Sequence, residues 1–192
     1  VKNRTVGQRV SIETHIPWGT CFACQNGMAH NCTNMTVYGI SCDGCFAQYA
    51  TVDANVTFVL PDEMSFEEGA LLEPAGVAMR AVEECYINIG DTVVVNGCGP
   101  IGLMAIQILQ VSGASRIIAV DLDDCRLKMA ESFGALPINV TKQDAVKEIL
   151  NLTRDRQGAD VVIEMSGSSI VYNNIFEMIR NEGRIVTVGH PN

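Results

Sequence analysis

Long apolar runs and basic residues are both scarce in this sequence. No stretch approaches the roughly 18 consecutive apolar residues that a membrane-spanning helix needs, so we expect no membrane partner and a cytoplasmic location. Lys and Arg number 13 against 22 Asp and Glu, which gives a formal net charge of -9. Because an acidic surface repels a phosphate backbone, this composition argues against a nucleic-acid partner.

Charge is missing altogether from residues 14–42, which contain no Asp, Glu, Lys or Arg. The same segment carries Cys21, Cys24 and Cys32 in a C-x2-C-x7-C spacing. Nothing in the sequence directs export to an oxidising compartment, so this spacing favours a metal site over disulfides. A zinc ribbon that grips nucleic acid carries Lys and Arg around its metal, and a charge-free lobe therefore indicates a structural element or an oligomer contact.

A closed tetrahedral zinc site needs four ligands, and this lobe supplies three cysteines. Trp18 stands where a fourth cysteine would be expected, while His30, Cys42 and Cys45 are other candidate ligands. Nothing in the sequence selects among them. The alternatives to a structural zinc are a lost site, ordinary buried thiols and a redox pair. The remaining cysteines are expected to be core or spacer residues: Cys85, Cys98 and Cys125.

Residues 1–62 differ in pattern from the rest of the chain, because they are rich in Gly, Thr, Asn and Cys. Short strands are predicted at residues 9–13, 46–52 and 56–60. Beyond them, Ser65 and Glu68 form a capping-box pattern, which predicts the start of a helix. The helical stretch reaches Cys85, and the pair Glu73-Pro74 is expected to break it.

After residue 91, predicted strands and helices alternate. The strands are expected at residues 92–96, 116–121, 138–140, 160–165 and 184–188. The helices are expected at residues 101–112, from Asp123 or Asp124 to Gly134, from a Thr141/Asp144 capping box to near Gly158, and from Ser168 or Ser169 onward. This alternation predicts an α/β fold with right-handed crossovers and a parallel sheet that is covered on both faces.

A glycine-rich loop joins the first of these strands to the first helix. Gly97, Gly99 and Gly102 match G-x-G-x-x-G, a pattern that becomes specific only in this strand–loop–helix context. We expect Gly97 to allow a tight turn, Gly99 to let the backbone approach a pyrophosphate, and Gly102 to let helix and strand pack closely. The N-terminus of the helix offers unpaired N–H groups to the phosphates.

An acidic residue, Asp121, ends the second strand 19 residues after Gly102. A carboxylate there accepts hydrogen bonds from the adenosine ribose and repels a 2′-phosphate, so the cofactor is expected to be NAD rather than NADP. Arg126 is placed to lie over the adenine. The alternative is that Asp121 only ends a strand and the glycines only make a turn.

These segments resemble a known family, the zinc-containing medium-chain alcohol dehydrogenases, over nearly the whole chain from Gly7 onward. The likeness rests on Gly7-Gln8-Arg9-Val10, the lobe from Gly19 to Cys32, Gly44 to Tyr49, Leu72-Glu73-Pro74, and the glycine loop with Asp121. Within the family, His15-Ile16 and Glu164 to Gly167 resemble the threonine-oxidising branch. The polyol-oxidising branch is similar too, notably at Leu72-Glu73-Pro74.

The resemblance implies the C-terminal part of a GroES-like substrate domain at residues 1–78 and an NAD-binding Rossmann domain at residues 79–192. The doubly wound sheet of that second domain is expected to be incomplete, ending after its fifth strand. The family uses a catalytic zinc to polarise the substrate hydroxyl, and hydride passes to the nicotinamide. The cysteine and Gly-His-Glu segment that hold this zinc are expected upstream of Val1.

Other roles follow from the resemblance alone. Glu73 matches a position that the family places beside the catalytic zinc or its substrate, although a Glu before Pro is otherwise a solvated helix residue. The resemblance places three groups of residues at the cofactor: Pro100, Ile101 and Gly102 at the pyrophosphate, Asp121 and Arg126 at the adenosine, and Ser166, Val188 and Gly189 along the cleft. Subunit contacts in the family imply a dimer or tetramer for the whole protein.

The function that we expect is NAD- and zinc-dependent oxidation of a secondary alcohol to a ketone, with a threonine-like substrate ahead of a polyol. The rival interpretation is a catalytically incomplete NAD-binding module, because the expected catalytic zinc ligands lie outside the 192 residues. A nucleic-acid-binding zinc ribbon is disfavoured by the charge-free lobe and the net charge.

Overall fold

The computed structural model describes residues 4–190. It divides into two compact units, Val1–Glu73 and Pro74–Asn192, which are described one at a time. The division falls inside a single helix, α2 (Phe66–Glu83), which also contains the boundary expected at residue 78. None of the helices within residues 4–190 has both the length and the apolar character needed to cross a membrane.

The first unit is built from two small antiparallel sheets. In one of them β1 (Val10–Ile12) pairs with β4 (Thr57–Val59), which confirms two of the expected strands in shortened form. In the other, β2 (His15–Ile16) pairs with β3 (Thr36–Val37). Between these two strands lies the cysteine lobe, with the one-turn helix α1 (Phe22–Gln25) and the 3-10 turn η1 (Ala29–Asn31). A further 3-10 turn, η2 (Ala54–Val56), precedes β4.

The strand predicted at residues 46–52 is wrong, because the segment is irregular in the structure. A strand needs a neighbour that satisfies its backbone N–H and C=O groups, and no described strand pairs with this segment. Phe46 and Tyr49 are fully solvent-exposed, with relative exposures of 110% and 86%. Their aromatic character favoured a strand in the sequence, but in the structure the two side chains do not pack against an apolar surface.

Helix α2 begins with the predicted capping box. The Ser65 N–H donates to the Glu68 carboxylate at 2.7 Å, and the Glu68 N–H donates to Ser65 Oγ at 3.0 Å. The predicted break at Pro74 is wrong, since the helix runs through it. The cap holds the first turns, and Ala78 and Ala81 are buried in the core beyond the proline. The interactions that stabilise α2 before and after Pro74 therefore outweigh the loss of the one backbone hydrogen bond that proline cannot make.

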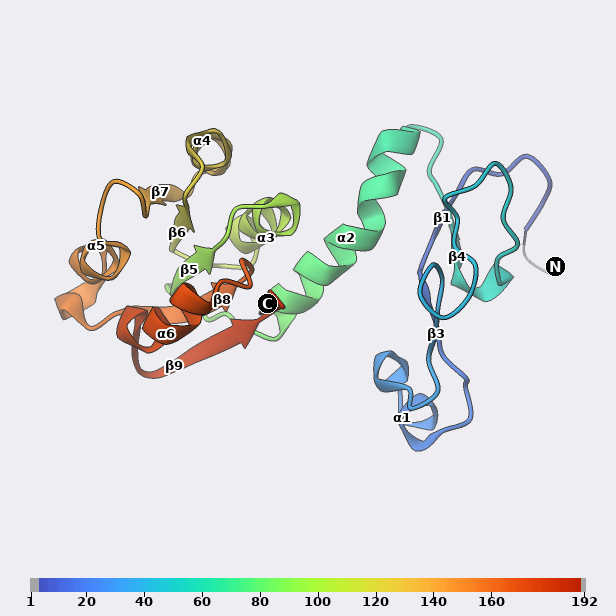
Figure 1. Ribbon diagram of the computed structural model, residues 1–192, viewed down its shortest axis with the longest axis horizontal. Helices are drawn as coiled ribbons and strands as arrows, with labels where there is room; N and C mark the ends of the chain where they lie inside the picture. The colour runs from blue at the N-terminus through green and yellow to red at the C-terminus, as the bar shows by residue number, and fades with distance from the viewer. Residues whose placement is uncertain (1–3, 191–192) are drawn as a thin grey trace. The chain divides into compact units, whose positions relative to one another are not determined.

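The second unit is a five-stranded parallel sheet in the order β7-β6-β5-β8-β9, which confirms the predicted doubly wound α/β fold (Figure 1). Its strands are β5 (Thr92–Asn96), β6 (Arg116–Asp121), β7 (Leu136–Asn139), β8 (Ala159–Glu164) and β9 (Ile179–Thr187). Its helices are α3 (Pro100–Val111), α4 (Asp124–Ser132), α5 (Ala145–Leu152) and α6 (Ser169–Met178), with a 3-10 turn η3 (Arg154–Arg156). The chain turns to opposite sides of β5, and in such sheets ligands bind at the carboxyl ends of the strands flanking that point.

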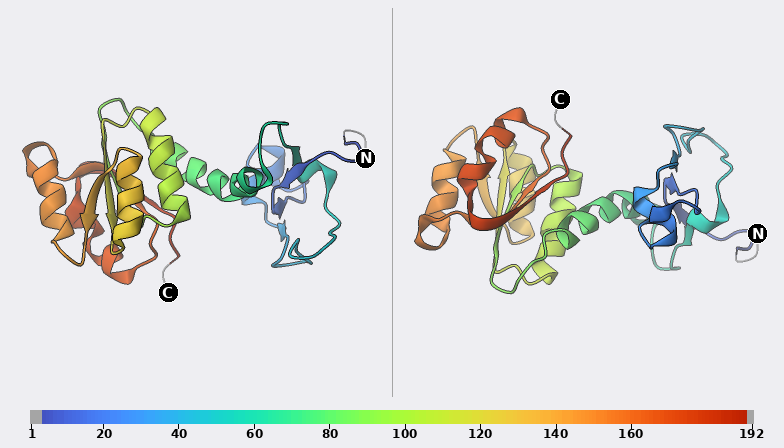
Figure 2. Two further views of the ribbon diagram at one scale, coloured as in Figure 1. Left: turned by 90° about the horizontal axis from the view of Figure 1, so that it is seen from above. Right: turned by 90° about the horizontal axis from the view of Figure 1, so that it is seen from below.

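Helices cover both faces of this sheet (Figure 2), and an apolar layer lies between the helices and the sheet on each face. One layer packs α3, α4 and the second half of α2 against one face, through side chains such as Val95 and Ile106. The other packs α5 and α6 against the opposite face, through side chains such as Val94 and Ile175. The strands consist of continuous apolar runs because both faces are covered.

The helix starts combine confirmed predictions with one correction. Asp123 caps α4 by accepting from the N–H groups of Cys125 and Arg126. The Thr141/Asp144 capping box is wrong. Asp144 itself caps α5 by accepting from the Lys147 N–H, and Thr141 bonds instead to the side chain of Asn139.

Candidate functional site

The glycine-rich loop lies between the end of β5 and the start of α3. Gly97 has φ of +96°, and a Cβ placed there would lie 2.8 Å from the backbone nitrogen of Ser166, in the loop after β8. Only glycine combines that backbone conformation with so close an approach. Gly97 therefore makes the tight turn and brings the loops after β5 and β8 together.

The other two glycines of the loop serve packing and access. A Cβ on Gly102 would collide with the carbonyl oxygen of Gly97, so Gly102 lets α3 pack against the turn. A Cβ on Gly99, the N-cap residue of α3, would meet nothing within 4 Å. Pro100 occupies the first turn of the helix, where its missing N–H costs no hydrogen bond. The positive end of a 12-residue helix thus faces an open space that suits a pyrophosphate.

Asp121 is buried at the end of β6 and is held by backbone groups. One carboxylate oxygen accepts from the N–H groups of Leu122 and Asp123, at 2.8 and 2.9 Å. The other accepts from the Cys98 N–H in the glycine loop at 2.7 Å. Arg126 lies 3.9 Å from the same oxygen. The carboxylate thus ties the glycine loop to the start of α4 and is fixed in orientation.

A cleft of about 660 Å³ opens at these carboxyl strand ends. Five of the predicted cofactor residues line it: Gly97, Gly99, Asp121, Arg126 and Ser166. Pro100, Ile101, Gly102, Val188 and Gly189 do not line it, and the cofactor roles assigned to all ten residues stay predictions. The cleft also contains residues that the sequence interpretation missed, among them Asn96, Ser168 and Asn174. Asn96 ends β5 and Ser168 is the N-cap of α6, and these positions were the signal that could have identified both residues. Asn174 lies within α6 and carried no such signal.

Glu164, another missed residue, organises the second side of the site. It is fully buried at the end of β8, and its carboxylate accepts from Ser166 and from the Gly167 N–H, the latter at 3.1 Å. Its backbone carbonyl accepts from the N–H groups of Val188 and Gly189 at 2.8 and 3.0 Å. Three residues predicted to line the cleft, Ser166, Val188 and Gly189, are therefore held by one residue, the first through its side chain and the other two through its backbone.

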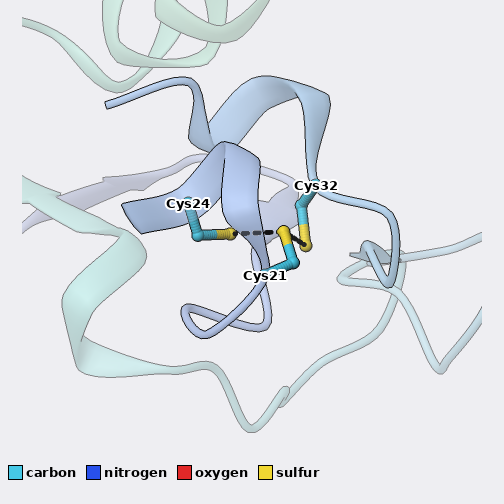
Figure 3. Close-up of side chains that lie close together, drawn as sticks. All are labelled: Cys21, Cys24 and Cys32. Carbon is cyan, nitrogen blue, oxygen red and sulfur yellow. Dashed lines mark hydrogen bonds between the residues drawn. The ribbon is translucent and has the colours of Figure 1, made fainter. Parts of the chain in front are cut away.

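The three lobe cysteines converge in the first unit (Figure 3). Their sulfur atoms all lie within 4.8 Å of one another, with Cys21 Sγ 3.4 Å from Cys24 Sγ and 3.9 Å from Cys32 Sγ. The backbone of Cys24 and Thr33 lowers the pKa of Cys21 to about 6, whereas desolvation and the neighbouring Cys21 raise the pKa of Cys24. A thiolate among thiols at this spacing fits a soft divalent metal such as zinc.

The fourth corner of that cluster carries no metal-binding side chain among residues 4–190. The proposed alternatives His30, Cys42 and Cys45 do not join the group. The backbone N–H of Trp18 donates to Cys32 Sγ at 3.2 Å instead. Within residues 4–190 the lobe therefore offers three protein ligands to a bound ion.

Glu73 lies on α2 and is partly buried. Its Oε1 accepts from Thr14 Oγ1 at 3.2 Å, which links the helix to the strand β2 region. Next to it, His15 Nδ1 lies 2.7 Å from Glu13 Oε1. The catalytic role of Glu73 stays a prediction.

The remaining cysteines occupy three different environments. Cys85 and Cys98 are buried in the core of the second unit, as expected, and Cys125 is exposed. Burial raises the pKa of Cys85 to about 12. Burial and the adjacent Asp121 raise the pKa of Cys98 to about 12. Both buried thiols are therefore neutral, inert packing groups at physiological pH.

Comparison with known proteins agrees with this geometry. A family model described as an alcohol dehydrogenase GroES-like domain matches residues 1–62, and one described as a zinc-binding dehydrogenase matches residues 100–192. The chain belongs to the zinc-containing medium-chain alcohol dehydrogenases. Both halves of the resemblance drawn from the sequence are thereby confirmed.

Individual members of the family cover the chain almost end to end. An L-threonine 3-dehydrogenase of Bacillus subtilis is 38% identical over 100% of this chain and 55% of the relative. A sorbitol dehydrogenase of the same organism is 36% identical over 97% of this chain and 53% of the relative. The crystal structure of a putative zinc-binding dehydrogenase from Sinorhizobium meliloti 1021, bound to NADP, superposes with a TM-score of 0.93 at 29% identity, covering 100% of this chain and 56% of that one. The chain thus spans about half the length of the relatives that it matches.

Proposed function

We propose that the protein takes part in NAD-dependent, zinc-dependent oxidation of a secondary alcohol to a ketone. The observation that carries this proposal is the cradle at the end of β5, where the open helix N-terminus at Gly99 and the fixed carboxylate of Asp121 meet one cleft. This arrangement suits a dinucleotide, with phosphates at the helix end and ribose hydroxyls at the carboxylate. Similarity to dehydrogenases over the whole chain supports the reaction class.

Each part of the chain has a separate task in this proposal. When bound, NAD accepts a hydride and zinc acts as a Lewis acid on the substrate oxygen. The N-terminus of α3 stabilises the pyrophosphate charge, and Asp121 fixes the ribose. The Glu164 carboxylate holds the loop after β8, and the Glu164 backbone carbonyl holds the residues after β9. Glu73 and Thr14 supply a polar surface on the substrate side.

Asp121 supports NAD over NADP, although one structural neighbour binds NADP. Its carboxylate already accepts three backbone hydrogen bonds, which fix its position where a 2′-phosphate would sit. The variant Asp121→Ser should weaken NAD binding relative to NADP by roughly tenfold or more, because one charge repulsion is removed. Calorimetric titration of both dinucleotides tests this, and an unchanged ratio would show that Asp121 does not select the cofactor.

We propose a threonine-like substrate ahead of a polyol. Support comes from the L-threonine 3-dehydrogenase and sorbitol dehydrogenase relatives, which are almost equally similar. The test is NADH formation by a protein of the relatives' full length, supplied separately with L-threonine and sorbitol. Turnover of L-threonine alone supports the first choice, turnover of sorbitol alone supports the second, and activity on neither rejects both.

A second candidate function is a dinucleotide-binding module without catalysis. It is favoured by one observation: among the described residues, the three lobe cysteines form the single group of side chains able to hold a metal. The 192-residue chain would then bind NAD and oxidise no alcohol. Any alcohol oxidation by that chain would reject this candidate.

We also propose a substrate, a zinc site, an assembly and a cellular location for the protein. We assign the small-molecule alcohol as its substrate, the cysteine lobe as a structural zinc site, and a dimer or tetramer as its assembly in full-length form. A cytoplasmic location agrees with free cysteines at all eight positions. Size-exclusion chromatography with light scattering would measure the assembly directly.

A further inference from the structure

Asn96, the last residue of β5, has a side chain that the fold of the protein does not satisfy. It is fully buried, and its Oδ1 is the one buried side-chain polar atom among residues 4–190 without a hydrogen-bond partner. Its Nδ2 meets only the Met178 sulfur, at 3.6 Å, which is a weak acceptor. An unpaired buried acceptor is costly, so its presence requires an explanation.

A second buried asparagine provides the contrast. Asn139 ends β7, as Asn96 ends β5 in the same sheet. Its Nδ2 donates to Asp124 Oδ1 at 2.7 Å, and its Oδ1 accepts from both the N–H and the Oγ1 of Thr141. The fold therefore uses Asn139 as a structural connector and leaves Asn96 unpaired.

Asn96 also belongs to the cofactor cleft. Asn96 lines that cleft together with the apolar side chains of Val120, Val171 and Met178. Asp121, the acceptor suited to ribose hydroxyls, stands at the end of the neighbouring strand β6. Asn96 therefore lies in a part of the cleft whose walls suit a flat, largely apolar group rather than a sugar.

We propose that Asn96 is a specificity-determining residue that accepts a hydrogen bond from the exocyclic amine of the adenine base. This inference rests on the proposed binding of NAD. An aminopurine presents an apolar face to the valine and methionine side chains and an N–H donor at its edge. That donor pairs the Oδ1 that the folded chain leaves free. A purine with a carbonyl at the same edge would place two acceptors against each other.

The test compares NAD with nicotinamide hypoxanthine dinucleotide, which has that carbonyl in place of the amine. Calorimetric titration of the chain should give NAD an advantage of about tenfold or more, because the analogue leaves Asn96 unpaired and opposed by an acceptor. In Asn96→Leu, which keeps the shape and removes the polar atoms, the two ligands should bind within about twofold. Asn96→Ala should lose the discrimination in the same way.

An advantage for NAD that persists in both variants overturns the proposal, and so does the absence of any advantage in the unmodified chain. Failure of both dinucleotides to bind the unmodified chain would instead reject the proposed function. The two failures are therefore distinguishable.

Thermal unfolding without ligand supplies an independent measurement. Asn96→Leu should raise the unfolding temperature, because it removes an unsatisfied buried acceptor. The matched variant Asn139→Leu should lower it, because it breaks hydrogen bonds that the fold uses. A lower unfolding temperature for Asn96→Leu would reveal a structural role and contradict the assignment.

Discussion

The two units of the chain are stabilised in different ways. Among described residues before Pro74, only Val56 and Leu60 are buried apolar side chains, whereas the second unit buries whole strands such as β5 and β8. The first unit relies more on polar links. Arg9 donates to the carbonyls of Met64 and Pro61 at 2.6 and 2.7 Å and lies 5.4 Å from the Phe66 ring centroid. Hydrophobic burial thus accounts for the stability of the second unit. Hydrogen bonds, together with a lobe that is able to bind a metal, account for the stability of the first.

The largest expected effect comes from opening the core of the second unit. Ile163→Ala, at a fully buried position in β8, should cost about 4 kcal/mol of unfolding free energy through lost burial and a cavity. Ile89→Ala, at a position 97% exposed, should change it by less than about 0.5 kcal/mol. Urea unfolding followed by circular dichroism measures both. Equal effects at the two sites would contradict the packing described for this unit.

A polar clamp in the same unit should rank next. Arg184 donates to the Cys85 carbonyl at 2.9 Å, after the end of α2, and pairs with the nearly buried Asp91. Arg184→Met leaves that carboxylate buried without its cation, which should cost about 3 kcal/mol. The control Arg80→Met removes exposed pairs to Glu83 and Glu84 and should cost less than about 1 kcal/mol. A cost for Arg184→Met no larger than the control would show that the clamp is dispensable.

Zinc should stabilise the first unit and leave the stability of the second unit unchanged. If Cys21, Cys24 and Cys32 bind the ion, zinc at 100 times its dissociation constant should raise the folding equilibrium constant of this unit about 100-fold. Hydrogen exchange followed by mass spectrometry can report each unit separately. Cys24→Ser should abolish the gain, and Cys125→Ser, at an exposed position outside the lobe, should retain it. Equal protection of β5 and the lobe by zinc would argue against a lobe site.

The smallest effect concerns the start of α2. Ser65→Ala removes a cap that bonds the Glu68 N–H, and it should cost about 1 kcal/mol. Ser168 is the N-cap of α6 but makes no side-chain capping bond, so Ser168→Ala should cost less. Thermal unfolding of the two variants gives the comparison. A larger loss for Ser168→Ala would contradict the capping geometry.

The sequence predicted the second unit well because apolar periodicity determines it. The strands at residues 92–96 and 116–121 match β5 and β6 in both bounds, since each has apolar residues on both faces, and the first is followed by a glycine while the second ends at an acid. The glycine loop was also predictable, because Gly97 and Gly102 occupy positions where a Cβ would collide with backbone.

The errors arose where tertiary contacts override local pattern. Pro74 does not break α2, because a cap and a buried face lie on either side of it. Residues 46–52 form no strand, because a β-like composition cannot provide a partner strand. Asn96 and Glu164 were missed as site residues for another reason. Their positions at strand ends could be predicted from the sequence, but whether a buried polar group is satisfied depends on loops distant in sequence.

The backbone bonds to Asp121 have a consequence for the kinetics of recognition. Three N–H groups from two segments hold this carboxylate, so its side-chain torsions are already fixed before any ribose arrives. Ordering a free side chain at an interface costs roughly 0.5–1.5 kcal/mol of free energy. For Asp121 this entropy is already lost when the chain folds, so ligand binding does not have to order the side chain. A nucleotide therefore encounters a rigid acceptor, and differences in affinity among nucleotides at this position should lie in how fast they leave rather than how fast they arrive.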